Sequence, residues 1–198
     1  MHVVPVTLEI PGGMVRLEPL QLTHAVDLFE AGGDDPRVWR YLAAWPHTIE
    51  EMQAVIAGAL EVQHAGRELP FAVIDAASGR AIGSTRYEEI LPKHRSLEIG
   101  WTWYGVPWQG TVCNAQCKFM LFRHAFESLG AVRVQLKADT RNERSRRAIE
   151  RIGAVFEGVL RKNRILPDGY VRDSAYYSVI AEEWPAVRSR LERLMAAA

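Results

Sequence analysis

The chain has 198 residues, of which 48% are hydrophobic and 24% are charged, which is the composition of an ordinary globular protein with a buried core. Its 24 basic residues balance its 24 acidic residues, so no global field draws it to nucleic acid or to an anionic membrane. The sequence has no apolar run of about 18 residues and no signal-peptide pattern, so we expect a cytoplasmic protein with one domain over 1–198.

The first half of the chain predicts two helices among four strands. Residues 15–20 alternate as a strand, and a helix is expected to follow from a cap at Thr23. Thr48 and Glu51 have the spacing of a capping box and predict a helix over 49–64. Three further strands are expected over 70–74, 81–90 and 97–103.

The second half begins with a long amphipathic helix over 113–129. Its apolar residues recur with the helical period: Ala115, Phe119, Phe122, Phe126 and Leu129. A strand over 132–138 follows, and then a helix that Asn142 caps and that stops at Gly153. A hairpin over 155–165 and 170–180 and a final helix over 185–195 complete the chain. These elements predict an α+β fold with a mostly antiparallel sheet, helices on both faces and one helix crossover between the two middle strands.

The joint between strand 97–103 and helix 113–129 is a candidate anion-binding loop. It reads Trp108-Gln109-Gly110-Thr111-Val112-Cys113-Asn114. The N–H groups in the first turn of a helix have no partner within it and point at whatever lies in front of them. The pattern alone is weak, because many such joints bind nothing.

Strict alternation in strand 97–103 predicts two opposite faces. One face is apolar and carries Leu97, Ile99, Trp101 and Trp103. The other carries Glu98, Gly100 and Thr102. A glutamate beside a glycine, on a strand that leads into an anion-binding loop, is a candidate general base. A structural carboxylate paired with an arginine is the alternative interpretation.

Polar residues gather at the start of the helix that Asn142 caps. Ser145 shares the inward stripe of this helix with Ile149 and Ile152, so its hydroxyl can donate a hydrogen bond or a proton to a ligand. The spacing alone favours a plain cap and a small packing residue. The helix also carries four arginines that either meet a nucleotide phosphate or form a solvated face: Arg141, Arg144, Arg147 and Arg151. Lys118 is ambiguous in the same way.

The two cysteines, Cys113 and Cys117, lie one helical turn apart, which is a poor arrangement for a stabilising disulfide and fits a reducing compartment. Together with His124 they share one face of the predicted helix. Three residues on one face are too few for a metal site without further ligands, so no metal is expected.

The order of the elements and their residues resembles the GNAT superfamily of acyl-CoA-dependent N-acetyltransferases, and within it the RimJ/RimL-type branch. The resemblance covers nearly the whole chain. The matching segments are Val15-Arg16-Leu17-Glu18-Pro19-Leu20, Leu97-Glu98-Ile99-Gly100-Trp101, Trp108-Gln109-Gly110-Thr111 with Asn114, His124-Ala125-Phe126-Glu127, Arg133-Val134, Asn142-Glu143-Arg144-Ser145, Ile152-Gly153-Ala154, Glu157-Gly158-Val159-Leu160-Arg161, Asp168-Gly169, Arg172-Asp173, Tyr177-Ser178 and Glu183-Trp184-Pro185.

This resemblance implies a mixed, mostly antiparallel seven-stranded sheet with splayed central strands that admit acetyl-CoA. The pantetheine arm would bond to the main chain of Trp101, Thr102 and Trp103, and Asn142 would also reach it. The pyrophosphate would lie on the loop residues Gln109, Gly110, Thr111, Val112, Cys113 and Asn114, with Arg147 as a further cofactor contact. Glu98 and Ser145 would be catalytic, with Ser145 near the thioester sulfur.

The sequence departs from the family pattern in three places. Val112 and Cys113 stand where small residues are common in the loop. The helix after Asn142 lacks the tyrosine that some members use as an acid, and Arg164 lies close to the place of a glutamate that some relatives carry. Ser145 and Glu98 are then the remaining candidates for the acid and the base.

The expected activity is direct acetyl transfer to a primary amine, carried by a protein N-terminus, a peptide or a small molecule. Two alternatives stay open: a catalytically weak acyl-CoA-binding sensor or scaffold, and a nucleotide-binding module that uses the arginine cluster over 141–151. No nucleic acid or membrane partner is expected, and a homodimer is left open.

Overall fold

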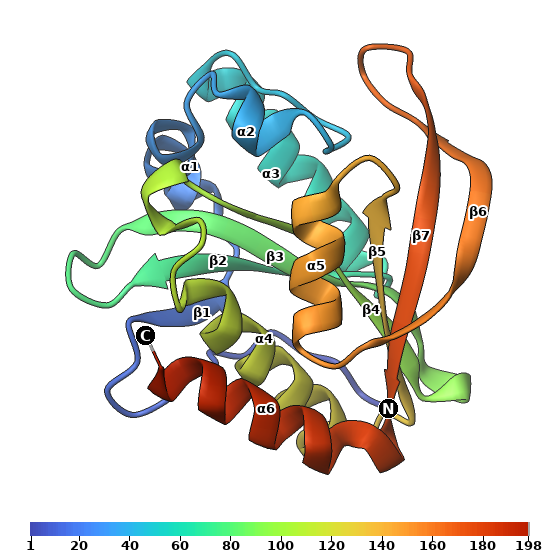
Figure 1. The fold of residues 1–198 in the computed structure, drawn as a ribbon. Helices are drawn as coiled ribbons and strands as arrows, with labels where there is room; N and C mark the ends of the chain where they lie inside the picture. The colour runs from blue at the N-terminus through green and yellow to red at the C-terminus, as the bar shows by residue number, and fades with distance from the viewer. Residues whose placement is uncertain (198) are drawn as a thin grey trace.

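The computed structural model describes residues 1–197. In this range seven strands form one sheet in the order β1-β2-β3-β4-β5-β7-β6 (Figure 1). Every neighbouring pair is antiparallel except β4 and β5, which are parallel and are joined through α4. The strands are β1 (Val15–Pro19), β2 (Leu69–Asp75), β3 (Ala81–Leu91), β4 (Ser96–Tyr104), β5 (Arg133–Asp139), β6 (Val155–Ile165) and β7 (Val171–Ile180). The α+β fold predicted from the sequence is confirmed.

The helices cover both faces of this sheet and bury two separate cores. They are α1 (Ala25–Gly32), α2 (Pro36–Trp39), α3 (Ile49–His64), α4 (Cys113–Arg123), α5 (Glu143–Arg151) and α6 (Trp184–Ala196). Helices α4, α5 and α6 pack on one face, and α1, α2 and α3 on the other (Figure 1). No helix within residues 1–197 has both the length and the apolar character that a bilayer crossing requires.

The predicted N-cap of α3 is confirmed, and the predicted N-cap of α1 is wrong. Helix α3 begins after Thr48, whose hydroxyl accepts a hydrogen bond from Glu51 N at 3.2 Å. The return half of the capping box does not form, because the Glu51 carboxylate accepts from His47 N instead. Thr23 is not the cap of α1: it lies inside a short 3-10 turn over Leu22–His24 that precedes the helix.

Helix α4 is buried on two sides, which its sequence pattern only half predicts. The aromatic stripe packs against Trp184 of α6, with ring centroids 6.1 Å from Phe122 and 5.7 Å from Phe126. On another side Cys113 and Cys117 are fully buried. Beyond Arg123 the chain continues as a π-helical turn over His124–Ser128, so the predicted single helix changes its winding near its end.

Candidate active site

Strands β4 and β5 separate halfway along their length. They pair at only three positions, the last of which joins Glu98 to Gln135. Beyond this point β4 keeps only β3 as a partner and β5 keeps only β7. The splayed central strands implied by the resemblance are therefore present, and each leaves a row of main-chain groups without a ladder partner on the side that faces the other strand.

A bulge in β4 lies where the strands part. Trp101 has a positive φ of 49°, and the pairing with β3 shifts by one residue at this point. The extra residue reverses the alternation, so Trp103 enters the core under α1–α3, whereas Leu97 and Ile99 lie in the core under α4. The prediction that Trp101 and Trp103 share a face with Leu97 and Ile99 is wrong for this reason.

Glu98 is completely buried beside the end of the β4–β5 pairing. Its Oε2 accepts a hydrogen bond of 2.8 Å from Gln135 Nε2, and its Oε1 lies 2.7 Å from Lys137 Nζ. Both partners come from β5, where residues two apart point to the same face. The sequence interpretation of a paired carboxylate is thus correct in kind, but the partner is a lysine and not an arginine.

Glu88 on β3 is a second carboxylate that sequence reasoning missed. It lies directly opposite Glu98 in the β3–β4 register and is almost fully buried. The pKa of Glu88 is raised to about 8, first by burial and then by repulsion from Glu98, against the attraction of Lys137. Nothing in the local sequence marks Glu88, because its position depends on how two strands align.

Gly100 makes room for the carboxylate pair. A Cβ atom at this position would lie 1.9 Å from Glu88 Oε2 and 3.0 Å from Glu98 Oε1. Real Cβ atoms essentially never approach another atom as closely as the first distance. The two carboxylates therefore converge over a backbone position that only glycine leaves free.

Lys118 and Thr102 form a second buried polar contact on the α4 side of the bulge. Lys118 Nζ donates to Thr102 Oγ1 at 2.9 Å, and the Thr102 hydroxyl also lies 2.8 Å from Thr85 Oγ1. Burial lowers the pKa of Lys118 to about 8. Thr102 thus faces α4, opposite to the side that strict alternation predicts.

The predicted anion-binding loop joins β4 to α4. Gln109 ties the loop to the strand, because its Nε2 donates to Tyr104 O at 2.9 Å. Gly110 has a positive φ of 78°, and the Thr111 hydroxyl accepts a hydrogen bond from Cys113 N in the first turn of α4. Asn114 Oδ1 accepts from the Tyr104 hydroxyl at 3.2 Å, so its side chain is already engaged.

The two bulkier residues of this loop, Val112 and Cys113, differ in how far their side chains are buried. Val112 is the N-cap position of α4 and is partly exposed, whereas the Cys113 side chain is fully buried in the core. The hydrogen bond with the nearby Cys117, followed by burial, raises the pKa of the Cys113 thiol. Both cysteines are free thiols. Residues 1–197 contain no group of three or more His, Cys, Asp and Glu side chains that could hold a metal ion.

Helix α5 places Asn142 and Ser145 on the other face of the sheet from Glu98. The Asn142 side chain caps the helix by accepting from Ser145 N at 3.1 Å, as the sequence predicts. Helix α5 lies on the same face as α4 (Figure 1), whereas Glu98 and Lys137 point to the face of α1–α3. Ser145 and Glu98 therefore face each other only across the region where β4 and β5 part. Arg147 is exposed and forms an ion pair with Glu143 one turn away.

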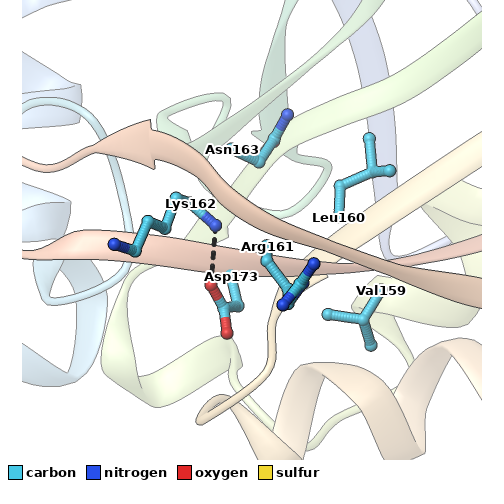
Figure 2. Close-up of a pocket in the computed structure, with 6 residues that line it drawn as sticks. All are labelled: Val159, Leu160, Arg161, Lys162, Asn163 and Asp173. Carbon is cyan, nitrogen blue, oxygen red and sulfur yellow. Dashed lines mark hydrogen bonds between the residues drawn. The ribbon is translucent and has the colours of Figure 1, made fainter.

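A concavity lies elsewhere, on the β6–β7 hairpin. Figure 2 shows its lining residues, and none of the predicted site residues is among them: Val159, Leu160, Arg161, Lys162, Asn163 and Asp173. It forms where β6 bulges away from β7, and Lys162 N donates to Asp173 Oδ1 at 2.7 Å (Figure 2).

Comparison with known proteins places the chain in a family. Solved structures of similar fold include a protein of T. thermophilus provisionally assigned as an acetyltransferase, which is 43% identical with 98% of each chain covered and a TM-score of 0.87. Mycobacterium smegmatis RimJ, solved in complex with CoA-disulfide, shares the fold at 24% identity, with 98% of this chain and 95% of RimJ covered and a TM-score of 0.79.

Among curated proteins, Bacillus subtilis (strain 168) YdaF, provisionally named a ribosomal N-acetyltransferase, is 37% identical over 107 residues. That match spans 54% of this chain and 57% of YdaF, so the chain aligns with little more than half of that relative. The family model described as the acetyltransferase (GNAT) domain matches residues 15–155, which is well over half of the sequence. The predicted resemblance is thereby confirmed, and the chain belongs to the GNAT family of acetyltransferases.

Proposed function

We propose that this protein transfers an acetyl group from acetyl-CoA to a primary amine by direct attack of the amine on the thioester. The observation that carries the proposal is the end of the β4–β5 pairing at Glu98 and Gln135. It leaves main-chain donors of β4 unpaired next to a buried carboxylate pair, which joins a binding surface for an extended ligand arm to a group that can accept a proton.

The residues present fit acetyl-CoA as the acetyl donor. When bound, acetyl-CoA supplies a thioester whose carbonyl can be attacked by an amine. The main chain of Trp101, Thr102 and Trp103 would hold the pantetheine arm, with Asn142 as a side-chain contact. The loop Gln109, Gly110, Thr111, Val112, Cys113 and Asn114 would hold the pyrophosphate at the start of α4. Arg147, exposed and paired with Glu143, would have to leave this ion pair to contact the cofactor.

The chemistry assigned to the chain's own residues has three parts. A main-chain N–H of the β4 bulge would polarise the acetyl carbonyl. The buried carboxylates beside Gly100, of which Glu98 is the member predicted from the sequence, would take the proton from the amine, directly or through a water. Ser145 would assist the departing sulfur. Holding both reactants together supplies much of the rate enhancement.

The acceptor is proposed to be a protein N-terminus, a peptide or a small amine. The name of YdaF points to ribosomal proteins as acceptors to test first. A cytoplasmic location, a single domain over 1–198, a homodimer and the absence of nucleic acid and membrane partners stay predictions.

The test combines two measurements on the same protein. Calorimetry with acetyl-CoA should give a saturable signal, and thiol release across a panel of peptides and small amines should depend on the amine. Binding without thiol release from any amine would instead favour the sensor or scaffold alternative. Equal affinity for ADP and acetyl-CoA would favour the nucleotide-binding module.

Replacing the predicted carboxylate tests the site itself. Glu98→Gln should lower kcat by about 10²-fold, because it removes a negative charge needed for proton transfer, and should leave the Kd for acetyl-CoA nearly unchanged. Steady-state thiol release and calorimetry on the same preparation check both expectations. Wild-type turnover across the pH range would remove Glu98 from the mechanism.

A further inference from the structure

The two carboxylates beside Gly100 are not equivalent in what they contact. Glu98 Oε2 accepts a hydrogen bond from Gln135 at 2.8 Å, and its Oε1 forms an ion pair with Lys137 at 2.7 Å but has no hydrogen-bond partner; the side chain is 0% exposed. The Glu88 side chain is 10% exposed, although its Oε2 is itself buried and, like Glu98 Oε1, has no hydrogen-bond partner. Lys137 Nζ lies 3.8 Å from Glu88 Oε2, too far for a hydrogen bond. Of these two carboxylates, Glu88 is the one with an exposed edge that an incoming group can approach.

The cations around the carboxylate pair approach it to different extents. Lys137 is the ammonium nearest to the pair, and it is closest to Glu98. Arg86, on the same strand, pairs with Glu68 at 2.8 Å and lies over the Trp101 ring at 4.4 Å, and its charge also acts to lower the pKa of Glu88, less strongly than Lys137.

The outer rim next to Glu88 is also occupied by paired charges. Glu89 lies 3.8 Å from Lys137 and 3.9 Å from Arg164 of β6. Further cations act on the pair from other elements: Lys118 of α4 and Arg172 of β7 interact with Glu98, and Arg86 interacts with Glu88. A positive substrate group at the exposed edge of Glu88 would add to these attractions and favour the ionised carboxylate.

We propose that Glu88 is a second catalytic carboxylate, which receives the acceptor as a primary ammonium ion and takes its first proton, while Glu98 is held by Lys137 and Gln135 as a positioning residue. This inference rests on the proposed acetyl transfer and defines its substrate class. The acceptor is an amine that is protonated near neutral pH, such as an α-amino group or a lysine side chain.

The protons and bonds in this step balance. The ammonium gives one proton to the Glu88 carboxylate and becomes a neutral amine. Its lone pair forms the new C–N bond while the C–S bond of the thioester breaks. The second proton leaves the nitrogen for the departing sulfur, and Glu88 returns its proton to solvent through its exposed edge. The products are an acetylated amine, CoA thiol and one free proton.

The raised pKa of Glu88 gives the proposal a measurable signature. A carboxyl group whose pKa is about 8 is protonated at pH 6 and becomes a proton acceptor as the pH rises through 8. The kcat/KM of the wild-type enzyme for the acceptor, which reports the free enzyme, should therefore rise with pH up to about 8 and then level off.

The experiment compares Glu88→Gln with Glu88→Asp and with Glu89→Gln. Glu89 is the matched control, because it is the neighbouring glutamate, carries the same charge and is exposed. On a lysine-containing peptide, Glu88→Gln should lower kcat by about 10²-fold and lose the rise of kcat/KM toward pH 8, with an unchanged Kd for acetyl-CoA. Glu88→Asp should keep part of the rate and the pH limb, and Glu89→Gln should behave like the wild type.

The outcomes distinguish a failure of the role of Glu88 from a failure of the proposed acetyl transfer. Wild-type kcat and pH profile in Glu88→Gln, with amine-dependent thiol release intact, would overturn the role of Glu88 and leave the proposed function standing. The absence of acetyl-CoA binding or of thiol release in the wild-type protein would overturn both. An unchanged melting temperature at pH 6 shows that a slow variant is folded.

Discussion

At the scale of single residues, the site depends on what is missing at position 100. Gly100 has no side chain, and the space that a Cβ would fill holds Glu88 Oε2 and Glu98 Oε1. Its backbone does not need the left-handed conformation, so glycine is required here for space and not for its φ angle. The carboxylate pair and the glycine are thus parts of one arrangement.

Gly100→Ala should therefore damage activity more than stability. The added methyl displaces the flexible Glu88 carboxylate from the pair, so kcat/KM should fall at least about 10-fold, the effect that a small misplacement in an active site produces. The matched control is Gly58→Ala in α3, where a Cβ meets nothing within 4 Å. That control should keep full activity and gain about 0.5–1 kcal/mol in the free energy of unfolding. Equal activity in the two variants would contradict the steric argument.

The buried Glu88 carboxyl also makes the stability of the protein depend on pH. Its pKa is 4.5 in its ordinary state and about 8 in the folded protein, so between these values the folded state holds a proton that the unfolded state releases. Stability conferred by this group is complete below pH 4.5 and is lost as the pH rises toward 8, with a slope of at most about 1.4 kcal/mol per pH unit.

Urea unfolding of the wild type and Glu88→Gln at several pH values isolates this contribution. The stability of the wild type relative to the variant should decline from pH 5 to pH 8 and stay constant above that. A difference that does not change with pH would mean that Glu88 titrates as an exposed glutamate.

At the scale of elements, local signals in the sequence predict where a helix or strand lies. They do not predict which face of the sheet each side chain of a bulged strand occupies. The helix over 49–64 and the strand over 155–165 have the predicted bounds, because caps, periodicity and turn residues act within a few positions. The bulge at Trp101 is different, since it exists only through the shifted pairing of β4 with β3. A strand examined alone cannot report that its alternation reverses.

The same limit applies to the candidate site: residues beside a local signal can be predicted from the sequence, and residues placed by strand pairing cannot. Glu98 and Asn142 could be singled out because each stands beside a local signal, a glycine-bearing strand and a helix start. Glu88 could not, because its contact with Glu98 is set by the alignment of two strands. Thr102 was placed on the wrong face for the same reason as Trp103. A pairing prediction for β3 and β4 would have corrected all three.

At the scale of the whole molecule, the sheet separates two cores and therefore two sides of the reaction. Helices α4 and α5 lie on one face with the anion-binding loop and Ser145, and α1–α3 lie on the other with the carboxylate pair (Figure 1). The donor and the acceptor would thus enter from opposite faces and meet where β4 and β5 part. This division follows from the parallel β4–β5 pair in an otherwise antiparallel sheet over residues 1–197.

Because β4 and β5 part, amide hydrogen exchange can detect donor binding without any measurement of turnover. Amides of β4 beyond Glu98 that face β5 lack a ladder partner, whereas β2 is paired on both edges. In deuterated water the peptide covering 99–104 should therefore take up label faster than the peptide covering 69–75. Saturating acetyl-CoA should slow uptake in 99–104 and leave 69–75 unchanged, which would map the donor's path by mass spectrometry even in a variant that has lost all turnover.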